Sequence, residues 1–111
     1  MGKLFVVGTP IGNLGDMTYR AVETLRTVDF ICAEDTRVTA KLLNYFDIKT
    51  PAVSYHEHNA KTAGEMVTNR ISAGEDCAIV TDAGMPCISD PGEELVKLCA
   101  EKGIEINVVP G

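Results

Sequence analysis

The sequence predicts an α/β fold: an open, mainly parallel sheet of five strands flanked by four helices. Short apolar runs alternate with amphipathic segments along the whole chain, as in repeated strand–helix units. Several of these runs consist of consecutive apolar residues without alternation, which is typical of strands covered by helices on both faces. The length of 111 residues suits one domain and not two. No internal repeat or linker interrupts the pattern.

The expected strands are the five apolar runs. In chain order they are Leu4–Val7, Phe30–Ala33, Ala52–Tyr55, Ala78–Val80 and Ile104–Val109. The first, second and fourth runs are continuous and should be covered on both faces. The last run alternates in part, so it could lie nearer an edge of the sheet. Crossovers between parallel neighbours should be right-handed.

Four segments between the strands carry apolar residues at the helical spacings of three and four. The residues expected to share a face are Val22, Leu25 and Val28 in the first segment, Val38, Leu42 and Phe46 in the second, Ala63, Val67 and Ile71 in the third, and Leu95, Leu98 and Cys99 in the fourth.

Start and stop signals mark the helix boundaries. Residues 90–93, Asp-Pro-Gly-Glu, predict the start of the fourth helix. Residues 62–65, Thr-Ala-Gly-Glu, form a capping box for the third helix, although Asn59 could cap it instead. Gly74 and Gly103 lie just past helical patterns, where glycine commonly ends a helix.

Composition excludes some classes of protein. The 16 acidic and 10 basic residues give a net charge of −6, which argues against the chain alone forming a nucleic-acid-binding surface. No apolar run approaches the roughly 20 residues of a membrane helix, and the amino terminus lacks a signal-peptide pattern. We therefore expect a cytoplasmic protein without a membrane partner. The 4 cysteines form no C-x-x-C pair, which favours buried free thiols over disulfides or a zinc site.

The unusual residues fall in the loops that leave the strands. These loops hold both histidines, two acidic clusters and nearly every Gly-Pro combination, and they span residues 8–16, 34–37, 56–59, 81–91 and 110–111. The loops that enter the strands have ordinary turn composition. Because ligands of open parallel sheets bind beyond the carboxyl ends of the strands, the sequence predicts the functional site at that edge.

Glycine and proline are concentrated in two of these loops. Residues 8–15 match no phosphate-binding glycine pattern, and Pro10 removes an amide donor. A ligand without phosphate is therefore favoured over a phosphate or a purely structural turn. Residues 81–91 exceed the roughly two to six residues of an ordinary strand-to-helix connection, which favours a functional role.

Two further loops are polar. His56 and His58 could begin a metal site, but no third ligand is apparent, so we expect no metal there. A polar cleft wall, a substrate contact or solvated loop residues all fit the segment 56–59. The segment 34–37, Glu-Asp-Thr-Arg, fits a functional acid pair and a helix start capped by Thr36 equally well.

Four motifs in this order resemble the small-subunit ribosomal RNA methyltransferases of the tetrapyrrole methylase superfamily. The motifs are Gly8–Leu14, Glu34–Arg37, His58-Asn59 and Asp82–Gly92, and the last is the most distinctive. The resemblance covers the whole chain. It implies two α/β domains with the cofactor bound in the cleft between them. Residues 1–111 would then be the N-terminal cofactor-binding domain, and the second domain would lie beyond Gly111.

The resemblance also implies an activity: transfer of a methyl group from S-adenosylmethionine to a cytidine ribose 2′-hydroxyl in 16S ribosomal RNA. The partner would be the 30S subunit, and the full-length protein would be a homodimer. The candidate cofactor-binding residues are Pro10, Asp82, Ala83, Gly84 and Ile88. The candidate catalytic residues are Asp35, Arg37, His58 and Asn59. Asp35, Glu57 and His58 remain open as the base that removes the hydroxyl proton.

The physical chemistry agrees with this implication. The cofactor carries no phosphate and its sulfonium is cationic, so a proline-interrupted glycine loop and an acidic cleft are both acceptable. Alignment for in-line displacement can supply much of the rate, roughly 7 to 11 kcal/mol in favourable cases. The acidic net charge stands in tension with an RNA substrate, and Arg37, Lys41 and Lys61 could form only a small basic rim near the cleft.

Two alternatives remain. One, within the same superfamily, is methylation of a tetrapyrrole or a diphthamide precursor. The other is a phosphoacceptor signalling domain, which needs an acid pair after the first strand, an Asp ending the third and a Lys after the fifth. The sequence has Gly8-Thr9, Tyr55-His56 and Val109-Pro110 at those places, which disfavours this class.

Overall fold

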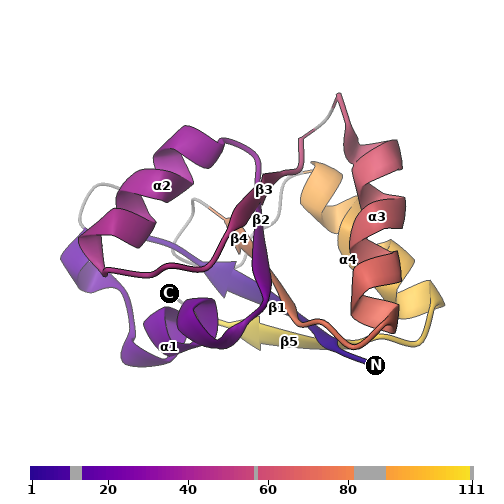
Figure 1. The fold of residues 1–111 in the computed structure, drawn as a ribbon, viewed down its shortest axis with the longest axis horizontal. Coiled ribbons are helices and arrows are strands. Elements are labelled where there is room, and N and C mark those ends of the chain that lie inside the picture. Colours follow the sequence, from indigo (N-terminus) through magenta and orange to yellow (C-terminus); the bar gives the residue numbers. More distant parts are fainter. Residues whose placement is uncertain (11–13, 57, 82–89, 111) are drawn as a thin grey trace.

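The computed structural model describes residues 1–10, 14–56, 58–81 and 90–110. Within these ranges, strands and α-helices alternate (Figure 1). The strands are β1 (Lys3–Gly8), β2 (Phe30–Ala33), β3 (Ala52–Ser54), β4 (Cys77–Thr81) and β5 (Glu105–Val109). The helices are α1 (Tyr19–Thr27), α2 (Thr36–Tyr45), α3 (Ala60–Ser72) and α4 (Asp90–Glu101), and a short 3-10 helix spans Leu14–Asp16. All five predicted strands are confirmed.

The strands form one sheet in the order β3-β2-β4-β1-β5. Every neighbouring pair is parallel, which confirms the predicted fold class. β5 lies at an edge, as its partly alternating sequence suggested. Because all strands run the same way, their carboxyl ends meet at one edge of the sheet.

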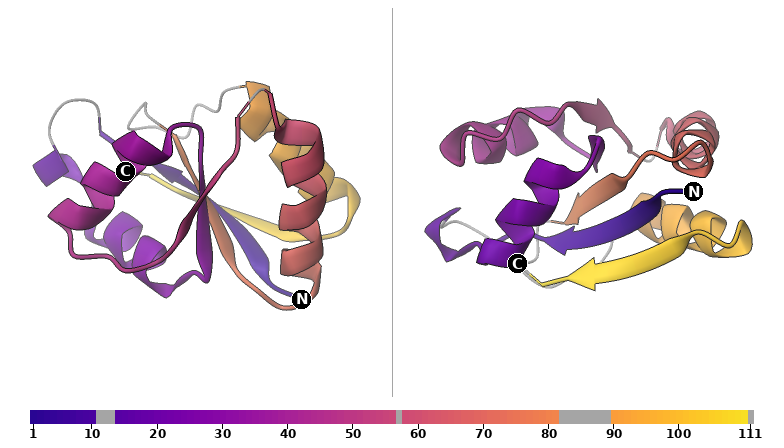
Figure 2. Two further views of the ribbon diagram at one scale, coloured as in Figure 1. Left: turned by 45° about the horizontal axis from the view of Figure 1, so that its top comes forward. Right: turned by 60° about the horizontal axis from the view of Figure 1, so that its bottom comes forward.

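The helices cover both faces of the sheet. Buried residues of α1 and α2, among them Leu25 and Leu42, pack in one cluster with the sheet residues Val7 and Ile31. Buried residues of α3 and α4 pack in a second cluster on the other face (Figure 2). The sheet is therefore the middle layer of three, and its carboxyl edge is framed by helices from both outer layers.

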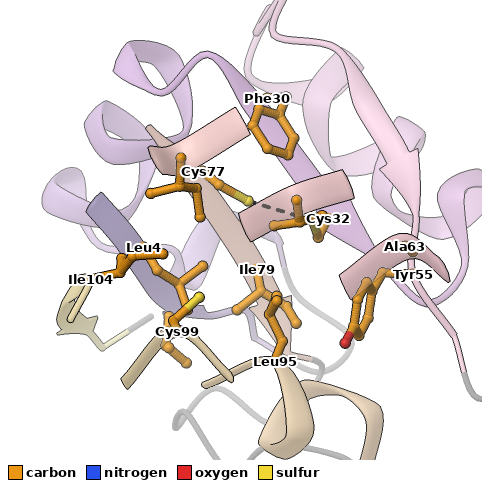
Figure 3. Packing of buried hydrophobic residues seen from close by; sticks show 13 residues of the cluster. Leu4, Phe30, Cys32, Tyr55, Ala63, Cys77, Ile79, Leu95, Cys99 and Ile104 are labelled. Atoms are coloured by element: carbon orange, nitrogen blue, oxygen red, sulfur yellow. Dashed lines mark hydrogen bonds between the residues drawn. The ribbon is translucent and has the colours of Figure 1, made fainter. Parts of the chain in front are cut away.

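The α3–α4 side of the core contains three of the cysteines (Figure 3). Cys32, Cys77 and Cys99 are buried and free, which confirms the prediction for these three. The Sγ atoms of Cys32 and Cys77 lie 3.4 Å apart on neighbouring strands. Burial raises the pKa of the Cys77 thiol and raises that of Cys99 to about 11, so these thiols are held neutral. Cys87 lies outside the described residues.

The structure corrects one predicted helix cap and decides between the two candidates for another. Asp35, not Thr36, is the N-cap of α2, and its side chain accepts a hydrogen bond from the Arg37 backbone N–H at 3.0 Å. The N-cap of α3 is Asn59, so Thr62 lies inside the helix and its capping box does not form. In both cases a residue nearer the preceding strand takes the cap position. α4 begins at Asp90, where its sequence pattern placed the start.

The predicted helix stops are confirmed. Gly74 and Gly103, after α3 and α4, have φ values of 113° and 74°. Asp47, after α2, adopts the same left-handed region with φ of 53°. Each of these three helices therefore ends in a residue that reverses the sign of φ.

The predicted buried face of α2 is wrong in one residue. Val38 is 53% exposed, whereas Thr39, Leu42 and Leu43 are buried. Leu42 and Leu43 anchor the helix to the sheet. Thr39, three positions before Leu42 and four before Leu43, lies on the face that these two share, whereas Val38 lies outside it. The helix is thus rotated so that Val38 faces outward.

Across the described ranges, no helix is long and apolar enough to cross a bilayer.

Candidate active site at the carboxyl edge of the sheet

The carboxyl ends of β1 and β4 are joined side by side. Gly8 of β1 is in register with Thr81 of β4. Immediately beyond, the backbone N–H of Thr9 donates to the carbonyl of Thr81 at 2.8 Å, and the Thr9 hydroxyl donates to the same oxygen. Thr9 is buried although it is polar. These bonds hold Thr9, just before Pro10, beside the last residue of β4.

β5 is fastened to the same place. Val7 of β1 is in register with Val109 of β5. The carbonyl of Pro110, just after β5, accepts a hydrogen bond from the Thr18 hydroxyl at 2.9 Å. Thr18 is also the N-cap of α1 and accepts from the Ala21 N–H at 3.1 Å. One side chain therefore sets both the start of α1 and the end of β5.

Among the candidate cofactor residues, the structure describes Pro10 alone. Pro10 is half-buried and follows Thr9 directly. Asp82, Ala83, Gly84 and Ile88 lie outside the described residues.

The Asp35–Arg37 pair lies after β2. Asp35 Oδ1 accepts from the Arg37 backbone N–H, and its distance to Arg37 Nε is 3.5 Å. The backbone hydrogen bond from Arg37 and then the Arg37 charge hold the pKa of the Asp35 carboxyl below its usual value. A lowered pKa makes Asp35 a weaker base, which argues against it as the group that removes a hydroxyl proton. The Arg37 side chain is 91% exposed and available to a ligand.

The histidine segment lies after β3 and is organised by Asn59. Asn59 Oδ1 accepts from the His56 backbone N–H at 2.8 Å, and its Nδ2 donates to the Ser54 carbonyl at 3.1 Å. His56 Nδ1 accepts a hydrogen bond from the His58 backbone N–H at 3.1 Å. His58 is exposed, and its ring centroid lies 5.8 Å from that of His56. Glu57 lies outside the described residues.

The two polar segments follow neighbouring strands. The backbone N–H of Tyr55 donates to the Ala33 carbonyl at 2.8 Å, so the chain ends of β2 and β3 stay paired up to the segments themselves. Among the described residues, no hydrogen bond joins Asp35 or Arg37 to the histidine segment. In the same part of the chain, no group of three or more His, Cys, Asp or Glu side chains is arranged to hold a metal ion.

Sequence reasoning missed the threonines that assemble the edge. Thr9 and Thr81 are 72 positions apart, and Thr18 and Pro110 are 92 positions apart. No spacing rule links residues so distant, although Thr9 stands within the singled-out glycine loop. Sequence reasoning also missed Tyr55, which is buried beneath the histidine segment and whose pKa is raised to about 12, mainly by burial.

The basic rim expected from the sequence is split between the two helical layers. Arg37 and Lys41 lie on α2. Lys61 lies on α3 and lines an open groove of about 530 Å³ between α3 and α4, together with Tyr55 and Lys97. The three cations therefore do not form one patch.

Comparison with known sequences finds one family and relatives that share one name. The family described as Tetrapyrrole (Corrin/Porphyrin) Methylases matches residues 3–111. "Ribosomal RNA small subunit methyltransferase I" of Synechocystis sp. is 58% identical over 111 residues, which are 100% of this chain and 40% of that protein. The protein of the same name from Thermotoga maritima is 55% identical over 111 residues, 50% of its length. The chain thus spans half or less of these curated relatives.

Comparison with solved structures gives the same fold. A cobalt precorrin-4 methyltransferase matches with a TM-score of 0.80 and 20% identity, over 98% of this chain and 45% of that one. Uroporphyrin-III C-methyltransferase from Thermus thermophilus, in a complex with S-adenosylhomocysteine, matches with a TM-score of 0.73 and 21% identity, over 99% of this chain and 48% of that one.

Proposed function

The chain belongs to the tetrapyrrole (corrin/porphyrin) methylase family, and we propose that it is the N-terminal half of an S-adenosylmethionine-dependent methyltransferase of small-subunit ribosomal RNA. One observation carries the proposal. Over the whole chain, identity is 58% and 55% to relatives named for ribosomal RNA, but only 20% and 21% to solved enzymes named for corrinoids or porphyrins. Substrate class follows the closer group.

The central region of the carboxyl edge fits this cofactor. Its described side chains, Thr9, Pro10, Thr81 and Pro110, are uncharged. A phosphate ligand would call for basic groups or a run of free amides, and Pro10 lacks an amide hydrogen. A sulfonium cation with an amino-acid tail and a nucleoside requires neither. We propose that Pro10 and, in the following loop of β4, Asp82, Ala83, Gly84 and Ile88 hold the cofactor, which supplies an electrophilic methyl group.

The polar segments after β2 and β3 serve the RNA. We propose that Arg37 binds a phosphate beside the target nucleotide and that the exposed His58 receives the proton of the ribose 2′-hydroxyl. Asp35 acts by capping α2, which fixes Arg37 at the start of the helix. Asn59 acts by holding the segment that carries His58. The target is a cytidine 2′-hydroxyl of 16S RNA within the 30S subunit.

The rest of the proposal concerns the whole protein. Because the chain spans 40% and 50% of two relatives, we propose that a second α/β domain follows it and closes the cofactor cleft. The full-length protein would be a cytoplasmic homodimer.

The test is methyl transfer by the full-length protein. Labelled S-adenosylmethionine is offered with 30S subunits, with a uroporphyrinogen and with a diphthamide precursor. We expect label only in 16S RNA, at a ribose that resists alkaline cleavage on its 3′ side. Label in the porphyrinogen or in the diphthamide precursor would assign the protein to another branch of the family. Label on a base would refute the 2′-hydroxyl target alone.

A further inference from the structure

The outer face of α2 carries a line of residues that the proposed chemistry does not use in full. Arg37, Lys41 and Tyr45 are spaced by four, so they follow one another along one side of the helix over about 12 Å. The Arg37 side chain is 91% exposed, Tyr45 is 61% exposed and Lys41 is exposed. Val38, beside them, is 53% exposed. We call Arg37, Val38, Lys41 and Tyr45 the α2 stripe.

The charge of α2 departs from that of the chain. Residues 36–45 include two cations and no Asp or Glu, in a chain of net charge −6. By contrast, residues 90–101 of α4, in the opposite helical layer, include four acids and one lysine. Among the described residues, no carboxylate lies within 4.0 Å of Lys41 Nζ. The stripe therefore presents two cations on an acidic molecule: Arg37, whose Nε lies 3.5 Å from Asp35 Oδ1, and Lys41, which has no such partner among the described residues.

The aromatic residue adds a second property. The ring of Tyr45 stands edge-on to Phe46, with centroids 4.8 Å apart and an angle of 77° between the planes. Phe46 steadies the ring while more than half of Tyr45 stays in solvent. Solubility alone explains exposed lysines, but it does not explain a large exposed aromatic side chain in line with them. Cations together with an exposed ring are the usual platform for single-stranded nucleic acid, whose phosphates and bases they contact respectively.

The position of the stripe relates it to the candidate site. α2 begins at Thr36, shortly after β2 ends at Ala33, so Arg37 is in its first turn near the carboxyl edge and Tyr45 is its last residue. Figure 1 shows the course of the helix away from β2. A strand of RNA that places its target nucleotide at the edge can continue along α2. The length of about 12 Å suits the phosphates of two or three successive nucleotides.

We propose that the α2 stripe binds a single-stranded segment of the RNA substrate next to the target nucleotide, with phosphates on Arg37 and Lys41 and a base stacked on Tyr45. This inference rests on the proposed function, because it takes RNA as the substrate. An RNA strand fits the stripe because the stripe has the charge opposite to a phosphate backbone and carries a ring suited to stacking.

The test uses the full-length protein and two pairs of variants. Lys41→Gln and Tyr45→Leu remove the charge and the ring, while Lys41→Arg and Tyr45→Phe keep them. Lys97→Gln on α4 is the matched control for loss of an exposed lysine in the other layer. Affinity for 30S subunits and for a single-stranded 16S RNA fragment is measured at several salt concentrations. Cofactor affinity, melting temperature and sedimentation are measured in parallel.

Each variant has a distinct expected result. Lys41→Gln should reduce the slope of log affinity against log salt by roughly 0.7, the value for one phosphate contact with a single strand. Tyr45→Leu should weaken RNA binding about tenfold with an unchanged slope, because stacking is not ionic. Lys41→Arg, Tyr45→Phe and Lys97→Gln should stay within about twofold of wild type. For Lys41→Gln and Tyr45→Leu, KM for RNA should rise while kcat and cofactor affinity stay unchanged.

Three outcomes would overturn the inference, and they are distinguishable. If all variants bind and methylate RNA like wild type, the α2 stripe is not the RNA surface, and the proposed function stands. If Lys41→Gln or Tyr45→Leu changes sedimentation but not RNA affinity, the stripe is a protein interface. If wild type neither binds nor methylates ribosomal RNA, the proposed function fails and this inference fails with it.

Discussion

Asn59 illustrates how one side chain can hold a loop through bonds to the backbone alone. Both polar atoms of its side-chain amide form hydrogen bonds to the backbone: Oδ1 accepts from the N–H of His56, and Nδ2 donates to the carbonyl of Ser54. Asn59→Asp keeps the acceptor but replaces the donor with a second acceptor that faces the Ser54 carbonyl. We expect the free energy of unfolding to fall by about 1 kcal/mol, measured by urea denaturation.

His58→Ala is the matched comparison for Asn59. The His58 ring is exposed, so its removal should leave the free energy of unfolding within about 0.5 kcal/mol of wild type while methyl transfer falls. If Asn59→Asp instead left stability unchanged and abolished methyl transfer, Asn59 would contact the substrate directly.

Glu75 and Arg70 form the best-defined ion pair of the described chain, at the opposite edge of the sheet. The guanidinium meets the carboxylate through two bonds of 2.8 Å and lies 3.7 Å from the centre of the Phe30 ring. The hydrogen bonds from Arg70 lower the pKa of Glu75. A lowered pKa stabilises the folded state above the usual glutamate pKa of about 4.3, and the contribution is lost as the pH falls through the lower folded value.

Glu75→Gln should therefore be less stable than wild type at pH 7, and the difference should shrink below about pH 4. Urea unfolding at both pH values measures it. The same measurement on Arg70→Gln, and on the double variant with Glu75→Gln, tests whether Arg70 is the partner of Glu75. The double variant should lose no more pH-dependent stability than Glu75→Gln alone. A difference that stays constant with pH would mean that the carboxylate is not held by Arg70.

At the scale of the element, three helices end in the left-handed region but with different residues. Gly103 occupies it without strain, and no atom lies within 4 Å of where a Cβ would stand. Asp47 adopts it despite its Cβ. Gly103→Ala should lower the free energy of unfolding by about 1 kcal/mol from backbone strain alone, and Asp47→Gly should raise it by a similar amount.

Denaturation curves of the two single variants check this pair. The Asp47 side chain pairs with Lys49 at 2.9 Å, but both side chains are more than 80% exposed, so its loss should matter little. Stabilisation by Gly103→Ala, or destabilisation by Asp47→Gly of more than 1 kcal/mol, would contradict the account.

The elements also show how much of the fold can be predicted from the sequence. The three central strands, β1, β2 and β4, are covered on both faces and continuous in apolar residues, so they could be found from that pattern. The edge strands β3 and β5 were found as shorter or partly alternating apolar runs. In α2, Leu42 belongs equally to a face with Val38 and to one with Thr39, and hydrophobicity favours the wrong one. Contact of Leu43 with the sheet decides between them, and that contact is not a local property of the sequence. The cap of α2 was misassigned for a similar reason, because Asp35 and Thr36 are both good capping residues.

At the scale of the whole molecule, the sequence indicates a candidate site at one edge of the sheet but not how its parts are brought together. The carboxyl edge followed from loop composition and parallel topology. The order of the strands along that edge did not, because no pattern within a strand says which neighbours it takes. The bonds from Thr9 to Thr81 and from Thr18 to Pro110 depend on that order. Thr9 and Thr81, like Thr18 and Pro110, are thus neighbours only in the folded chain.

The proposed second domain leads to a prediction about the 111 residues alone. Ligand pockets normally enclose most of the ligand surface, and this chain would supply one wall of the cleft. We expect its affinity for S-adenosylmethionine to be at least about tenfold weaker than that of the full-length protein, measured by calorimetry. Equal affinities would show that the chain holds the cofactor unaided and would remove the need for a closing domain.

The place of β1 between β4 and β5 also governs how the chain leaves the ribosome. The first strand to be synthesised is paired on both sides, and both partners are synthesised after most of the chain: Leu4 waits for Cys77, and Val7 waits for Val109. At about 5 to 20 residues per second, the last partner emerges roughly 5 to 20 seconds after β1. The apolar strand has two open edges until β4 emerges and one open edge until β5 emerges. Chaperone contact with the nascent chain should therefore be concentrated on residues 3–8 and should end only when residue 109 is free.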